Sequence, residues 1–228
     1  MTTFQRLNLS AAALCAGLLM QSGAHAVALT PPVGSFADTA LPGTTSAARP
    51  ELAGLVLEDV LTPFSFNGIT GTVQNRVVRE NVGGTLDFYW KVNVASNATG
   101  AGIEAFRLAD FGDSHLKDAD WRIDGLGTVA PTIGRLFNAA SYPTGDLNFL
   151  FGTPLTAAGQ SSKFFFLHTG AKAYAKTGTF DLLCTSGSCI SGLTATFAPS
   201  AVPEPASYAL MAVGMAMVGW RTRRRAGR

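Results

Sequence analysis

The chain has 228 residues, of which 47% are hydrophobic and 14% charged, and its formal net charge is +2 at neutral pH. Between the two ends lie roughly 175 residues, enough for one domain with its own core, so no second domain is required. The ends hold six of the 17 basic residues but one of the 15 acidic residues, which leaves 11 basic and 14 acidic residues in the middle. A nucleic-acid-binding protein concentrates positive charge on its folded part, so we expect no nucleic-acid partner.

The start of the chain has the order of an export signal. One positive charge, Arg6, precedes an apolar run over residues 11–20, and the small residues Ala24 and Ala26 follow. Signal peptidase requires small side chains at two such positions, so residues 1–26 are predicted to form a signal helix cleaved after Ala26. The alternatives are a buried helix of a cytosolic domain and a lipoprotein signal, which lacks its small residue before the cysteine.

Residues 27–50 are rich in Ala, Pro, Thr and Gly and show neither helical nor strand periodicity. We therefore expect a flexible, extended leader in front of the folded domain, which we place at residues 51–199.

The clearest strand pattern lies at residues 85–94. Its apolar positions alternate with polar ones, which predicts a half-buried antiparallel strand; the apolar face holds Leu86, Phe88, Trp90, Val92 and Val94, and the polar face holds Asp87, Tyr89, Lys91 and Asn93. Gly83-Gly84 indicates a turn before this strand, and the β-rich residues 71–80 are its expected hairpin partner.

A second hairpin is predicted at residues 178–197, around the loop 185–188. Folding about this loop sets Cys184 opposite Cys189, and the same register sets Leu182 opposite Ser191 and Phe180 opposite Leu193. These are the two cysteines of the mature chain, and an even pair in an oxidising compartment predicts a disulfide. The alternative is a zinc site, but one Cys-x4-Cys pair without a neighbouring histidine has poor zinc spacing.

The rest of the middle region also favours strands. Residues 163–167 are a short apolar run typical of a more central strand, and residues 101–110 fit either a short helix or another strand. Gly and Pro interrupt nearly every interval, and no amphipathic helix of three turns stands out. We predict an all-β, antiparallel β-sandwich that is jelly-roll-like.

The last 27 residues, 202–228, have three parts in a fixed order. Residues 206–220 are an apolar stretch of about 15 residues, which spans about 22 Å as a helix and is short for a hydrocarbon core of about 30 Å. This predicted transmembrane helix is preceded by Val202, Pro203, Glu204 and Pro205 and followed by the basic end 221–228, with Arg221, Arg223, Arg224 and Arg225. The arginines would act as a stop-transfer signal and remain in the cytoplasm.

Physics alone leaves a plain C-terminal anchor and a processing signal equally open. The three parts together, however, resemble the PEP-CTERM sorting signal, which combines Val-Pro-Glu-Pro, a short transmembrane segment and an arginine-rich end. The resemblance implies exosortase as the processing partner, loss of the tail, and delivery from a transient inner-membrane anchor to the cell surface or extracellular matrix. It covers the tail alone and implies no function for the domain before it.

The sequence of the domain gives weaker signals of catalytic or metal-binding sites than the tail gives of sorting. The acid-rich residues 110–120 are the best site, yet they lack the order of a calcium loop and favour a solvated loop. Asp118, Asp120 and Asp124 are close enough in sequence to suggest glycoside hydrolysis, without evidence that they share a cleft. His115 and His168 are the histidines of the mature domain, and no Gly-x-Ser-x-Gly nucleophile elbow accompanies them. We therefore expect no catalytic residues, no metal and no cofactor.

Exposed aromatic side chains could stack on sugar rings, and the candidates are Tyr89 and Trp121, of which Trp121 fits the core better. The sequence thus leads to a non-catalytic, exported surface or matrix protein that associates with exopolysaccharide. The alternative is a secreted carbohydrate-binding module or carbohydrate-active enzyme that uses the same export route.

Overall fold

The computed structural model describes residues 27–112, 116–138, 147–185, 189–201 and 215. Within these residues the chain folds into strands, with one short 3-10 helix, η1, over Pro50–Leu52. The strands are β1 (Phe36–Ala40), β2 (Gly54–Phe66), β3 (Ile69–Glu80), β4 (Leu86–Asn97), β5 (Ile103–Ala109), β6 (Leu116–Trp121), β7 (Pro131–Phe137), β8 (Leu147–Leu155), β9 (Phe165–Thr169), β10 (Tyr174–Cys184) and β11 (Thr194–Pro199). The expected all-β class is confirmed.

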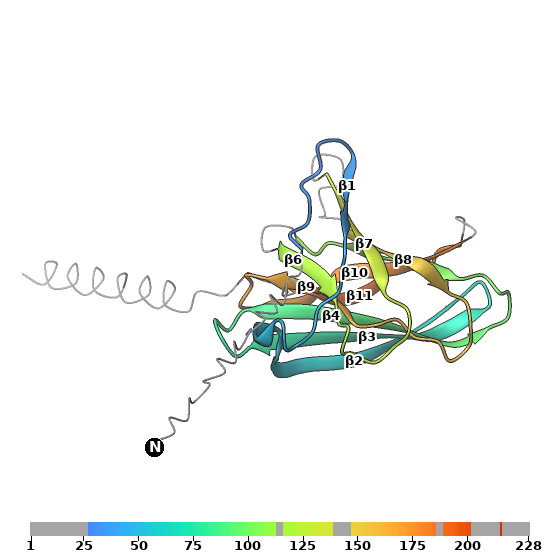
Figure 1. The fold of residues 1–228 in the computed structure, drawn as a ribbon, viewed down its shortest axis with the longest axis horizontal. Helices are drawn as coiled ribbons and strands as arrows, with labels where there is room; N and C mark the ends of the chain where they lie inside the picture. The colour runs from blue at the N-terminus through green and yellow to red at the C-terminus, as the bar shows by residue number, and fades with distance from the viewer. Residues whose placement is uncertain (1–26, 113–115, 139–146, 186–188, 202–214, 216–228) are drawn as a thin grey trace, which may run out of the picture.

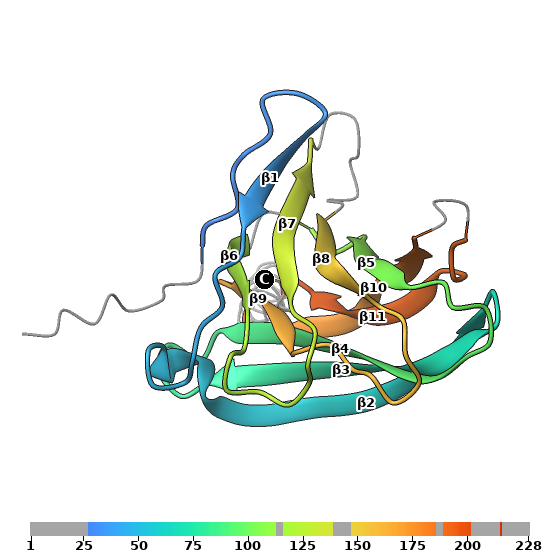
Figure 2. The same cartoon turned by 45° about the vertical axis from the view of Figure 1, so that its right-hand side comes forward.

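The strands form two sheets whose neighbouring strands all run antiparallel. One sheet has the order β1-β7-β8-β5-β10-β11 and the other has the order β2-β3-β4-β9-β6. Figures 1 and 2 show the long strands β2, β3 and β4 as one layer, with the strands of the six-stranded sheet above them. This arrangement agrees with a β-sandwich, and the finer jelly-roll-like strand order stays a prediction.

Aromatic side chains from both sheets meet in the core. The ring of Trp90 in β4 lies 5.5 Å from that of Phe106 in β5 and 6.4 Å from that of Phe149 in β8, measured between centroids. Phe165 in β9 lies 4.7 Å from Phe149. Because aromatic rings bury large areas and favour tilted contacts, this cluster holds the two layers together.

The first predicted hairpin is confirmed. Strands β3 and β4 pair along their lengths, with Val77 opposite Phe88 and Val73 opposite Val92. The apolar face of β4 is buried at every position from Leu86 to Val94. Its polar face is less open than alternation predicts, since Asp87 and Tyr89 are also buried.

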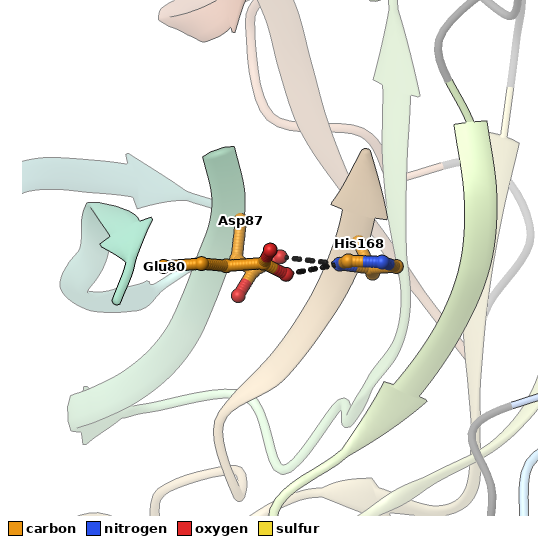
Figure 3. A group of neighbouring side chains, drawn as sticks. All are labelled: Glu80, Asp87 and His168. Carbon is orange, nitrogen blue, oxygen red and sulfur yellow. Dashed lines mark hydrogen bonds and ion pairs between the residues drawn. The ribbon is translucent and has the colours of Figure 1, made fainter. Parts of the chain in front are cut away.

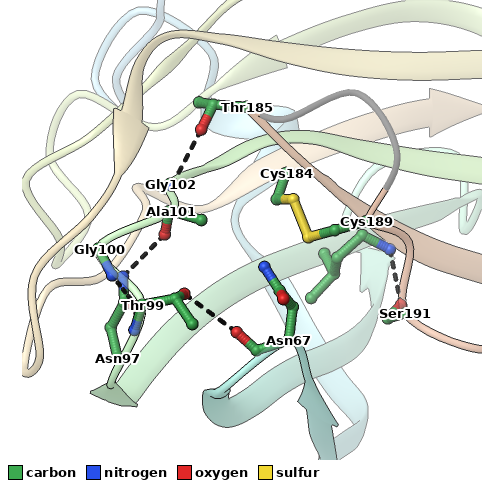
Figure 4. Close-up of a disulfide and its surroundings, with 11 residues drawn as sticks. Asn67, Asn97, Thr99, Gly100, Ala101, Gly102, Cys184, Thr185, Cys189 and Ser191 are labelled. Carbon is green, nitrogen blue, oxygen red and sulfur yellow. Dashed lines mark hydrogen bonds between the residues drawn. A yellow bond between two sulfur atoms is a disulfide. The ribbon is translucent and has the colours of Figure 1, made fainter.

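The second hairpin follows the predicted register near its loop and departs from it farther away. The Cys184 N–H donates to the Cys189 carbonyl at 3.0 Å, and the Ser191 N–H donates to the Leu182 carbonyl at 2.9 Å. The Cys184–Cys189 disulfide, drawn in Figure 4, is present as predicted.

The predicted pairing of Phe180 with Leu193 is wrong by one residue, because Phe180 pairs with Thr194. The Leu182 N–H donates to the Ser191 side-chain oxygen at 2.8 Å. The segment between Ser191 and β11 therefore holds one extra residue before regular pairing with β10 begins at Thr194, as in a β-bulge. Leu193 is left 73% exposed.

Residues 27–50 are not a separate leader in the structure. Strand β1 pairs with β7, and Val27 forms a bridge with Ala119 in β6. Leu41 and Thr44 are buried. The segment lacks a long alternating pattern because only short stretches of it pair, and the rest crosses the outside of the sheet.

The segment 101–110, which fitted either a helix or a strand, contains β5. The more central strand predicted at residues 163–167 corresponds to β9, which begins at Phe165 and lies between β4 and β6. The acid-rich residues 110–120 are not simply a solvated loop, since β6 begins at Leu116.

The predicted signal helix lies outside the described residues, as does the predicted transmembrane helix apart from Met215. In the part of the chain that the structure covers, no helix is both long and apolar enough to cross a membrane.

Candidate functional site

The five-stranded sheet carries a row of polar side chains on the face that points away from the core. Adjacent strands place Asp87 in β4 opposite His168 in β9, and His168 opposite Asp118 in β6. Because side chains alternate across a strand, these residues share one face, opposite to the face that holds Phe88 and Leu167. A polar row on an outer face would normally lie in water.

Here the chain segment 41–53, which includes η1, covers part of that face. The Gly43 N–H donates to the Asp120 carboxylate at 2.7 Å, and the Tyr89 hydroxyl donates to the Leu52 carbonyl at 3.4 Å. Leu52, Tyr89 and Phe166 pack together as a small second apolar cluster. The polar row is consequently buried, and its groups must find partners within the protein.

The most unusual group in this row is a cluster of Glu80, Asp87 and His168 (Figure 3). One carboxylate oxygen of Glu80 and one of Asp87 each lie 2.8 Å from Nδ1 of His168. The side chains of all three residues are at most 9% exposed. Asp87 Oδ2 and Glu80 Oε1 are buried without a hydrogen-bond partner.

Burial and charge act on the cluster in opposite directions. Burial raises the pKa of Asp87 to about 6, although the hydrogen bond with His168 lowers it in part. Burial alone would lower the pKa of His168, but its hydrogen bond to Asp87 and the neighbouring carboxylates raise it overall. The cluster therefore favours a positive charge between its two carboxylates.

Arg49 lies beside this cluster but is already engaged. Its guanidinium bonds both oxygens of Asp118, at 2.9 and 3.3 Å, and Glu51 at 2.7 Å. The Arg49 side chain is 7% exposed and that of Asp118 16%, so this ion pair is largely buried, whereas Glu51 is 39% exposed. The hydrogen bonds of Arg49 thus go to Asp118 and Glu51, and it acts on Asp87 only through its charge.

The three aspartates considered for glycoside hydrolysis are held by different partners. Asp118 binds Arg49, whereas Asp120 accepts the backbone N–H groups of Gly43 and Trp121. Asp124 accepts from Arg122 at 2.9 and 3.1 Å and from Ser46. Of the three, Asp124 lines the groove described next, and Asp118 and Asp120 are not among the lining residues of that groove.

A groove lies next to the buried polar row and has a volume of about 450 Å³. Its lining includes Arg76, Arg122, Asp124, Leu126 and Phe164. The Arg76 guanidinium lies 4.7 Å from the centre of the Phe164 ring, a cation–π arrangement. The groove thus combines an aromatic face with polar groups of both signs.

The two aromatic residues proposed from sequence behave differently from each other. Tyr89 lines the groove but is 4% exposed, so the expectation of an exposed stacking platform is wrong. Tyr89 lies on the outer face of β4, as the alternating pattern predicts, but segment 41–53 covers this face and Tyr89 packs against Leu52 and Phe166. Trp121 packs against the main core, in agreement with the prediction that it fits the core better than a sugar-stacking role. Its indole N–H donates to the Leu41 carbonyl at 3.2 Å.

Several predicted site residues lie outside the described residues. These are the signal positions Ala24 and Ala26, the candidate histidine His115, the sorting motif Val202, Pro203, Glu204 and Pro205, and the basic residues Arg221, Arg223, Arg224 and Arg225. Their expected roles rest on sequence alone.

Comparison with known protein families identifies a motif at the C-terminal end of the chain. Residues 201–225 match the family model described as the PEP-CTERM protein-sorting motif. The chain is therefore a protein that carries a PEP-CTERM sorting motif at its C-terminal tail, which supports an exported protein processed by exosortase. No curated protein and no solved structure matches the chain.

Sequence reasoning missed Glu80 and Asp87 as site residues. Both lie in segments whose pattern predicts ordinary strands, and the pattern around His168 indicates no partner for it. Asp87 and His168 are 81 residues apart in the chain and meet only because β4 and β9 pair. The available signal was Asp87, a carboxylate on the polar face of the strongest apolar alternation in the sequence.

Proposed function

We propose that this protein is exported, cut by exosortase near Pro203-Glu204-Pro205, and delivered to the cell surface or extracellular matrix. There its β domain acts without catalysis and associates with exopolysaccharide. The observation that carries the proposal is the sorting motif at residues 201–225. Signal peptidase and the export machinery act first, and the inner membrane holds the tail transiently.

The way the domain ends supports cleavage at this place. Strand β11 ends at Pro199, and the Ser200 N–H donates to the Ala173 carbonyl at 3.0 Å. The matched motif begins at residue 201, directly after that hydrogen bond. A cut near Glu204 would leave every described strand intact, since none extends into the motif.

The first test is the substitution Glu204→Ala in the full chain. Prolines on both sides of an acid favour an extended backbone that a processing enzyme can bind, so a variant without the acid should keep its tail and remain in the inner membrane. Immunoblots of inner-membrane, outer-membrane and medium fractions measure this directly.

Glu104→Ala is the matched control, because it removes the same side chain from the folded domain and leaves the motif intact. Wild-type processing is expected for the control. Unchanged processing and sorting of the Glu204→Ala chain would contradict the proposal.

The aspartates of β6 and its following turn support a non-catalytic role for the domain. Asp118 and Asp124 are each tied to an arginine, and Asp120 to two backbone N–H groups. A general acid or base needs a carboxyl group within hydrogen-bond reach of a substrate, and these three are committed to internal partners.

The groove beside Phe164 favours sugar binding by this domain, whether as a matrix component or as a dedicated binding module. Its aromatic ring and polar rim suit the apolar face and hydroxyl edge of a sugar. The exported protein should bind saturably on a glycan array, and Phe164→Ala should weaken binding by at least about tenfold.

Phe36→Ala is the matched control for that test. Phe36 also carries an arginine over its ring, with Arg135 at 4.2 Å, but it lies in β1 of the other sheet. Equal losses in both variants would contradict the groove as the binding place. Sugar turnover by the wild-type protein would select the carbohydrate-active enzyme instead.

A further inference from the structure

In the cluster of Glu80, Asp87 and His168, two carboxylate oxygens lie within hydrogen-bond distance of a single imidazole nitrogen. Two carboxylate oxygens lie 2.8 Å from the same His168 Nδ1. A ring nitrogen carries at most one proton and can donate it to one of them. The Nδ1 proton of His168 is assigned to Asp87, which leaves Glu80 Oε1 buried and without a hydrogen bond.

The local charge is also unbalanced. Glu80 and Asp87 bring two carboxylates to a place where His168 can supply one positive charge. Arg49, the nearby cation, is hydrogen-bonded to Asp118 and Glu51 and acts on Asp87 only through its charge at longer range. Isolated buried charge is costly, so a group of this kind is stable when a cation binds to it.

The geometry suits a metal ion of ordinary size. The three ligand atoms all lie within 4.8 Å of one another. Oxygen and nitrogen ligands lie about 2.1 Å from zinc, so neighbouring ligands of a tetrahedral ion are about 3.4 Å apart. His168 and each carboxylate would need to separate by only about 0.6 Å to admit the ion, a shift that leaves the strands in place.

Surrounding groups already orient one ligand. The Thr85 hydroxyl donates to Glu80 Oε2, which leaves Oε1 directed at His168. Hydrogen bonds of this type hold metal-binding carboxylates in position. All three ligands come from the paired strands β3, β4 and β9, so the site has a rigid base.

We propose that Glu80, Asp87 and His168 bind one divalent transition-metal ion, with zinc as the occupant to be tested. Mixed imidazole and carboxylate ligands suit zinc or manganese, whereas calcium and magnesium prefer oxygen alone. Three protein ligands leave a fourth position for water. The sequence expectation of no metal, with calcium considered only at residues 110–120, pointed to neither this place nor this chemistry.

The test uses the untagged full chain in detergent, stripped with a chelator and titrated with Zn²⁺ in a calorimeter. We expect one equivalent to bind and the unfolding midpoint to rise with Zn²⁺ but not with Mg²⁺. Asp87→Asn and His168→Gln should each weaken Zn²⁺ binding at least about tenfold. Asp59→Asn is a matched control, because Asp59 lies outside the cluster and bonds Arg76 and Gln74, and it should bind Zn²⁺ as the wild type does.

Absence of one-equivalent binding in the wild-type chain would overturn the proposal, and so would unchanged affinity in folded cluster variants. Where a cluster variant fails to fold, zinc X-ray absorption on the wild-type chain decides. One imidazole among oxygen ligands at about 2.0–2.2 Å supports the site. A sulfur shell, or ligation without imidazole, rejects it.

Discussion

At the scale of single residues, the polar side chains under segment 41–53 are the least ordinary feature of the domain. Asp87 and Asp120 are fully buried, and Arg49 nearly so, on a face that alternation alone would leave in water. Each requires partners, and those of Asp120 are the backbone N–H groups of Gly43 and Trp121. These side chains therefore make the stability of the domain depend on pH.

Asp120 gives the clearest pH prediction. Burial raises its pKa from 3.8 to about 6, against the smaller effect of its two backbone hydrogen bonds. Between these values the folded chain holds a proton that the unfolded chain has lost, so stability falls as pH rises from about 4 to about 6. The Asp120→Asn variant lacks this titrating group. Between pH 4 and pH 7 its unfolding free energy should therefore fall by less than that of the wild type, with a difference on the order of 1–3 kcal/mol.

Urea unfolding followed by tryptophan fluorescence at a series of pH values measures this difference. Asp124→Asn is the opposite control, because the hydrogen bond from Arg122 lowers the pKa of Asp124. That group stabilises the fold at neutral pH and loses its contribution as the pH falls. Identical pH profiles for wild-type and Asp120→Asn chains would show that Asp120 does not titrate as described.

At the scale of elements, strand β11 links the folded domain to the sorting tail. It lies at the edge of its sheet and pairs with β10. A buried chain of hydrogen bonds ties it to the opposite sheet: the Trp90 indole donates to Thr196 Oγ1 at 2.9 Å, and Thr196 donates to Asn75 at 2.9 Å. One hydroxyl thus joins β11 to both β4 and β3.

Thr196→Val tests the importance of that link. The variant keeps the shape of the side chain but leaves the Trp90 N–H and the Asn75 carbonyl oxygen without partners, which should cost about 2 kcal/mol of unfolding free energy. Chemical denaturation checks the value. Thr194→Val, on the same strand but half-buried, should change stability by less than about 0.5 kcal/mol. Equal effects of the two substitutions would contradict the proposed link.

The elements also show what the sequence could predict. Residues 85–94 alternate strictly, so β4 and its pairing with β3 followed from pattern alone. The hairpin near Cys184 followed from loop length, but the extra residue after Ser191 depends on a side-chain hydrogen bond that no pattern encodes. Strand β1 was missed because its five residues are stabilised by pairing with β7, about 100 residues away.

The candidate site was less predictable than the fold for the same reason. Asp87, His168 and Asp118 meet through strand pairing between distant segments, and their burial depends on the covering segment 41–53. The sorting tail was the opposite case. Its information lies in a short contiguous order of residues, and the family comparison confirms it.

At the scale of the whole molecule, the domain and the tail have separate proposed roles, binding and delivery. The described strands end at Pro199, and the sorting motif begins two residues later. The sorting motif therefore lies outside the described strands, while sugar binding is proposed for a groove of the domain and metal binding for a buried cluster within it. A loss of zinc binding should leave sorting unchanged, and a blocked tail should leave zinc binding unchanged.

The intact mass of the wild-type protein recovered from the cell surface or medium tests the central claim most directly. We predict a mass for a chain that starts at Val27 and ends near Pro203-Glu204-Pro205, with both the signal and the apolar tail removed. A surface-delivered protein that retains residues 206–228 would contradict processing at the sorting motif.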